Sequence, residues 1–166
     1  MFPLNGKITS SPLNILAYQT EMLMKDIEEI KATLKQNGCD WERVGEYMMF
    51  SDQKSSILAT YIIYTNYSKS TQKERWGWIY YGCERSGLFY TMDASRFEKM
   101  ILESFATSTK GKGKTSHIRK SISAVRTLME TEITMRITGQ KGFELEQTHQ
   151  KCQNIAETLK KYCTTE

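Results

Sequence analysis

A short basic segment, KGKGKTSHIRK at positions 110–120, holds the residues best suited to binding chemistry. It leads into a predicted helix beginning at Ser116, and exposed N–H groups at a helix N-terminus attract phosphate. No acidic residue occurs from Lys110 through Arg126, so we expect an unopposed positive field there. The residues predicted to contact a phosphodiester backbone are Lys110, Lys112, Lys114, His117, Arg119, Lys120 and Arg126.

The segment also permits two other interpretations. Gly113-Lys114-Thr115 matches the end of a P-loop, but Ser108 stands where the motif requires its first glycine. The preceding element also reads as a helix rather than a strand, so a nucleotide-binding loop is not expected. A solvated surface loop, kept in solution by its charge, remains an alternative to nucleic-acid contact.

An aromatic cluster at positions 75–83, RWGWIYYGC, is the second candidate. On a strand, alternate residues share a face, so Trp76, Trp78 and Tyr80 would stand together. Such a face can stack unpaired bases. The alternative is that these rings fill the core against a helix.

Catalytic and metal chemistry have little support in the sequence. Glu146, His149 and Cys152 would share one helical face, but no second pair of ligands accompanies them. The other histidine, His117, lies in the basic segment. We therefore predict no catalytic residue, no metal site and no cofactor.

The four cysteines form no CxxC pair, and the N-terminus shows no basic stretch followed by an apolar one. These features favour an intracellular protein, cytoplasmic or nuclear, with reduced and buried thiols. No apolar run is long enough to span a membrane, so no membrane partner is expected. The alternative is a secreted chain with two disulfides, in which Asn66-Tyr67-Ser68 would accept a glycan.

Residues 1–10 read as an N-terminal arm, and residues 11–166 as a single domain. Ser11-Pro12 is a helix start and Asn37-Gly38 a helix stop, which predicts one long helix between them. Apolar residues recur along it at steps of three and four. The members proposed as an oligomer interface are Leu16, Leu23, Ile27, Ile30 and Leu34. The same seam could instead pack on its own domain.

The middle of the chain is rich in β-branched and aromatic residues, which favour strands. Positions 57–67, 75–83 and 88–92 are predicted to form a three-stranded antiparallel meander, with 84–87 as a hairpin connection. Positions 57–67 could also be helical.

The remaining segments read as helices. Asp40 and Asp93 are expected N-caps of helices over 41–50 and 94–106. Two further helices are expected from 116 onward and over 143–162, while positions 132–138 are ambiguous between helix and strand. The predicted fold is therefore α+β, with a long N-terminal helix, a small meander and a C-terminal helical group.

The chain has 166 residues, 39% of them apolar and 25% charged, which is typical of a folded globular domain. A net charge of +4 and a pI near 8.8 are only mildly basic. We predict a non-enzymatic nucleic-acid-binding protein, favouring RNA over DNA, that self-associates. Composition suggests a viral or mobile-element accessory protein. A protein-interaction module and a small enzyme with a site assembled from dispersed residues are the alternatives.

Overall fold

The computed structural model describes residues 26–49, 52–105, 114–134 and 139–163. These residues form seven helices and no β-strand: α2 (Ile27–Gln36), α3 (Trp41–Gly45), α4 (Gln53–Ser68), α5 (Arg75–Ser86), α6 (Ala94–Ser104), α8 (Lys114–Thr134) and α9 (Gly139–Cys163). The predicted α+β fold with a three-stranded meander is therefore wrong, because the segments assigned to the sheet are helices or a connection.

The two predicted aspartate caps are confirmed. Asp40 Oδ1 accepts a hydrogen bond from the backbone N–H of Arg43 at 3.1 Å, and Asp93 Oδ1 accepts one from Arg96 at 2.8 Å. Each cap satisfies a backbone donor that has no partner within the first helical turn. The helix after Asp40 is shorter than predicted, since α3 ends at Gly45.

The predicted single helix between Ser11 and Asn37 is wrong, because α2 begins only after Asp26. This residue is extended (φ −86°, ψ 170°), and its side chain accepts a hydrogen bond from Glu29 N at 2.8 Å to cap α2. An extended residue cannot lie inside an α-helix. The part before position 26, including the predicted arm, lies outside the described residues.

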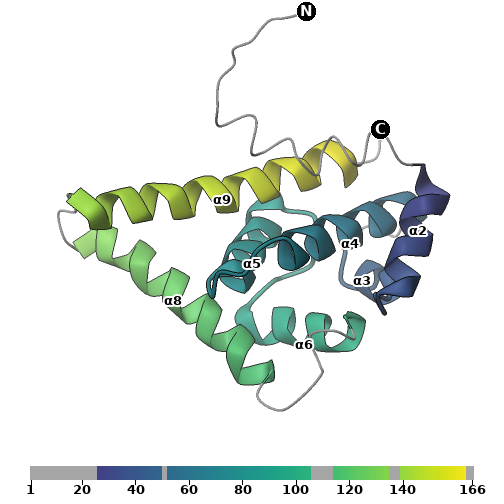
Figure 1. Cartoon of the computed structure of the whole chain (residues 1–166), viewed down its shortest axis with the longest axis horizontal. Coiled ribbons are helices and arrows are strands. Elements are labelled where there is room, and N and C mark those ends of the chain that lie inside the picture. The colour runs from purple at the N-terminus through teal and green to yellow at the C-terminus, as the bar shows by residue number, and fades with distance from the viewer. Residues whose placement is uncertain (1–25, 50–51, 106–113, 135–138, 164–166) are drawn as a thin grey trace, which may run out of the picture.

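The predicted strands over 57–67 and 75–83 are the central helices α4 and α5 (Figure 1). Helix α4 packs against α2, α3, α5 and α9, while α5 packs against α4, α8 and α9. Every residue from Ser55 through Ile63 is consequently buried, as is every residue from Trp76 through Tyr80. Hydroxyl groups in these runs find partners within the helix or on a neighbouring element. Thr60 Oγ1 donates to Ser56 O at 2.7 Å, and Ser55 Oγ donates to Cys163 O on α9 at 2.6 Å.

The third predicted strand, 88–92, is a connection between α5 and α6. It makes one isolated antiparallel bridge, Met48 to Phe89, with the segment after α3. The predicted hairpin at 84–87 is instead the last turn of α5 and its C-cap. Gly87 has φ +71°, a left-handed conformation that glycine adopts without strain.

The two C-terminal helices are confirmed, and α8 continues as a helix through Thr134, which resolves the first part of the ambiguous segment. In Figure 1, α9 runs along one side of the molecule and α8 descends from its first turn, with α4 and α5 beside them and α6 near the start of α8. None of the described helices combines the length and apolar character needed to cross a lipid bilayer.

Helix α5 approaches both of these helices closely at glycines. The N–H of Gly77 donates to Ser121 Oγ on α8 at 2.9 Å. A Cβ at Gly77 would lie 2.5 Å from Val125 Cγ2, and one at Gly82 would lie 2.4 Å from Ile155 Cγ2 on α9. The absence of a side chain at both positions therefore permits the close approach of α5 to α8 and α9.

Candidate functional site

The basic segment lies only partly within the described residues. Lys110 and Lys112 are outside them, while Lys114 is the first residue of α8, two positions before the predicted start. Helix α8 therefore begins inside the Lys/Gly-rich sequence. Its first described side chain, His117, is exposed, and Ile118 is buried against the core.

Arg119 and Lys120 occupy the outer side of the first turns of α8. Lys120 is exposed, whereas Arg119 Nη1 lies 3.2 Å from Glu98 Oε1 on α6. The expectation of an unopposed positive field is therefore wrong at Arg119, because a carboxylate distant in sequence reaches it. The guanidinium side chain nevertheless keeps 48% exposure, and that of Glu98 only 11%.

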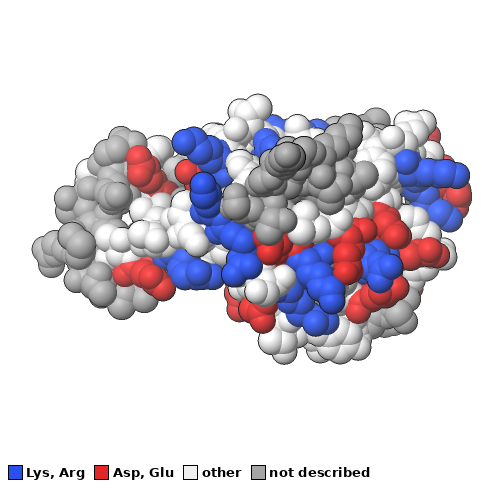
Figure 2. Space-filling view, turned by 90° about the horizontal axis from the view of Figure 1, so that it is seen from below, with Lys and Arg blue, Asp and Glu red and all other residues white. Residues whose placement is uncertain are grey.

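Arg126 lies two turns beyond Arg119 and is half-buried. The next acidic residue along α8 is Glu130, so the described cations Arg119, Lys120 and Arg126 follow one another without an acidic residue between them. Figure 2 views the side on which α8 begins. Lys and Arg side chains gather across its middle, and Asp and Glu lie among them toward one end.

The three aromatic candidates do not stand on a sheet face. Trp76, Trp78 and Tyr80 lie on α5 and are 1%, 7% and 7% exposed. The Trp76 ring stacks on Tyr67 with centroids 4.4 Å apart and meets Phe97 edge-on at 6.1 Å. These rings form part of a packed aromatic core, as the alternative interpretation expected. They present no open face for a base.

The described residues of the proposed oligomer seam also lie in the core or pack against it. Ile30 and Leu34 are 1% and 0% exposed inside the chain's own core, and Ile27 packs against that core. Leu16 and Leu23 lie outside the described residues. The described part of the seam therefore holds α2 onto α4 rather than facing solvent.

The Glu146-His149-Cys152 stripe is confirmed as helical but gathers no further ligand. His149 Nδ1 lies 3.0 Å from Arg85 Nη2, and Cys152 is fully buried. Within the ranges that the structure describes, no three His, Cys, Asp or Glu side chains are grouped to hold a metal. The four cysteines, Cys39, Cys83, Cys152 and Cys163, are all buried free thiols, which contradicts the two-disulfide alternative.

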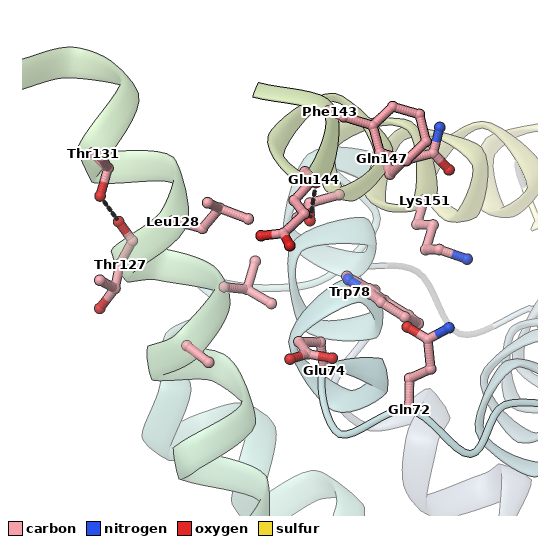
Figure 3. Close-up of a pocket in the computed structure, with 13 residues that line it drawn as sticks. Gln72, Glu74, Trp78, Thr127, Leu128, Thr131, Phe143, Glu144, Gln147 and Lys151 are labelled. Carbon is pink, nitrogen blue, oxygen red and sulfur yellow. Dashed lines mark hydrogen bonds between the residues drawn. The ribbon is translucent and has the colours of Figure 1, made fainter. Parts of the chain in front are cut away.

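A cleft that no sequence pattern indicated lies between α5, α8 and α9 (Figure 3). Its volume is about 580 Å³, within the range of small-molecule sites. The described residues that line it are Gln72, Glu74, Trp78, Ala124, Val125, Thr127, Leu128, Thr131, Phe143, Glu144, Gln147, Thr148 and Lys151. These positions are dispersed over three helices and one connection, and no spacing in the sequence joins them.

Comparison with known proteins assigns no relationship. No protein-family model, curated protein or solved structure matches the chain. A functional assignment therefore depends on the residues and their geometry.

Proposed function

We propose that this chain is a non-enzymatic nucleic-acid-binding protein that contacts the phosphate backbone through the start of α8 and the Lys/Gly sequence before it. The observation that carries the proposal is the charge of one stretch. Between Glu103 and Glu130 the chain contains six Lys or Arg residues and no Asp or Glu. The six are Lys110, Lys112, Lys114, Arg119, Lys120 and Arg126.

The geometry of α8 supports this assignment. The N-terminal end of a helix carries a partial positive charge that adds to that of nearby lysines. Lys120 is exposed in the second turn of the helix, and half of the Arg119 side chain remains open despite its contact with Glu98. Glycines at positions 111 and 113 permit a close approach of the backbone to a phosphate.

The proposal covers RNA and DNA alike. A backbone contact is tolerant of sequence, and its strength depends on how many phosphates are neutralised. Stacking by Trp76, Trp78 and Tyr80 gives no preference for either nucleic acid, because these rings are in the core. They have no part in the proposed contact.

The test is a salt titration of binding to labelled single- and double-stranded RNA and DNA. Changing Lys110, Lys112 and Lys114 together to alanine removes three cations. We expect a weaker affinity at low salt and a salt dependence whose log–log slope falls by about 2 to 3. Lys120→Ala alone should reduce the slope by about 0.7 to 0.9.

The matched control changes Lys35, Lys54 and Lys73 to alanine, three exposed lysines outside α8. This variant has the same net charge as the first and should keep the wild-type slope. Glu98→Gln is the converse variant, because it releases Arg119 from its carboxylate and should strengthen binding. Equal losses in the two triple variants would overturn the proposal and would assign the lysines to general solubility.

A further inference from the structure

The cleft between α5, α8 and α9 contains a buried hydrogen-bond donor without an acceptor. Trp78 is 7% exposed, and its Nε1–H has no hydrogen-bond partner. A buried donor left without an acceptor carries a free-energy penalty, because it has given up its hydrogen bond to water. Figure 3 shows the nitrogen end of the indole turned toward the space between Glu74 and Glu144. A ligand atom that accepts this hydrogen bond would remove the penalty.

Two carboxylates flank this donor from different helices. Glu74 is the N-cap residue of α5, yet its side chain makes no capping hydrogen bond. Glu144 comes from the first turns of α9, and both carboxylates line the cleft. The positive charge among the lining side chains is Lys151, whose Nζ lies 4.6 Å from the centroid of the Trp78 ring. Described lining residues therefore carry a net negative charge, which favours a cationic ligand.

Two of the three threonine hydroxyls that line the cleft already donate hydrogen bonds within their own helices. Thr131 Oγ1 donates to Thr127 O at 2.8 Å, and Thr148 Oγ1 donates to Glu144 O at 2.8 Å. These protons are already used within α8 and α9. An anionic ligand would therefore approach two carboxylates, while two of the threonine protons are already engaged.

The remaining wall of the cleft is apolar. Val125 and Leu128 line it from α8, and Phe143 lines it from α9 with 57% of its surface exposed. Covering apolar surface is favourable by about 25 cal/mol per Å². The ligand therefore needs an apolar body as well as polar groups.

We propose that this cleft binds a small organic amine. The protonated amine would lie between Glu74 and Glu144, an oxygen acceptor would receive the Trp78 Nε1–H, and a ring or short hydrocarbon would contact Leu128 and Phe143. This site is separate from the start of α8, so the inference does not depend on the nucleic-acid proposal.

Three probes with one skeleton test the charge requirement. They are 2-phenoxyethylamine, 2-phenoxyethanol and phenoxyacetate, which are cationic, neutral and anionic and share a phenyl ring and an ether oxygen. Binding is followed by the indole N–H resonance of Trp78 in a ¹H–¹⁵N spectrum, identified as the signal missing from Trp78→Phe. We expect the amine to shift this resonance saturably and to bind about tenfold or more tightly than the alcohol, a difference of about 1.4 kcal/mol. The acid should bind more weakly still.

Variants test the role of the two carboxylates. Glu74→Gln with Glu144→Gln should reduce amine affinity to that of the alcohol and leave alcohol affinity unchanged. Lys151→Gln is the matched control and should not weaken amine binding. Equal affinities for amine and alcohol in the wild type, or no movement of the Trp78 resonance at about 10 mM amine, a concentration that would detect a millimolar Kd, would overturn the proposal.

Discussion

At the scale of single residues, the four cysteines behave as core side chains whose chemistry is suppressed by burial. Burial raises the pKa of Cys39, Cys152 and Cys163 from 9.0 to about 12, and it also raises the pKa of Cys83. A thiolate is the reactive form of cysteine, so these thiols are inert in the folded chain. This inertness agrees with their role as small apolar groups in the core.

A prediction follows from the direction of these pKa shifts. The folded chain keeps its thiol protons above pH 9, whereas the unfolded chain loses them, so the free energy of unfolding falls as pH rises from about 9 toward 12. Urea denaturation across this range should show the decline, and Cys152→Ala should show a shallower one. In parallel, a thiol reagent at pH about 8 should leave the native protein unmodified and should label all four cysteines in urea. Rapid labelling of the native chain would contradict the buried placement.

At the scale of the helices, the sequence predicted the amphipathic elements and failed for the central ones. The helix in α8 was recognisable because Ile118, Ile122 and Val125 recur on one face and polar residues cover the other. Helix α4 has no polar face, since it is enclosed by its neighbours and buried from Ser55 through Ile63. Without an exposed face the helical period disappears, and a run of β-branched and aromatic residues then looks like a strand.

The two candidate sites also differ in how clearly the sequence indicated them. The basic stretch was visible because its charges are adjacent in sequence, but Glu98 was not foreseeable because α6 brings it to Arg119 only after folding. The Trp78 cleft had no signal in spacing. Gly77 and Gly82 within the aromatic run were the available hint, since glycines there permit close packing of helices.

The close packing of α5 at Gly77 leads to a prediction about stability. In Gly77→Ala the new methyl group would lie 2.5 Å from Val125 Cγ2 and 2.7 Å from the backbone oxygen of Ser121. We expect the free energy of unfolding to fall by about 1 to 3 kcal/mol, as for an overpacked core. Urea denaturation measures this change.

Repeating Gly77→Ala in a Val125→Ala protein identifies which contact causes the loss of stability. Val125→Ala removes the Cγ2 contact but not the Ser121 carbonyl, so the alanine at position 77 should cost less in that background and still destabilise. A stabilising effect of Gly77→Ala, as expected for an open helix position, would contradict the close approach of α5 and α8.

At the scale of the whole molecule, the charge is distributed unevenly over a chain with a net charge of only +4. The six cations between Glu103 and Glu130 exceed that net charge, so the rest of the surface is close to neutral or slightly acidic. A polyanion would therefore meet one preferred region rather than a uniformly basic surface. This asymmetry explains why the matched lysine control is a decisive comparison for the proposed function.

Self-association stays a prediction, and the structure restricts which residues can mediate it. Ile30 and Leu34 are committed to the core beneath α2, so the part of the seam left for a second copy is Leu16 and Leu23. Changing both to aspartate in the full chain should lower the mass measured by sedimentation to that of a monomer, with helicity and Tm retained. Leu34→Asp should instead unfold the chain, because it places an unpaired charge in the core. A wild-type chain that is already monomeric, or a Leu16/Leu23 variant whose mass is unchanged, would exclude the seam as an interface.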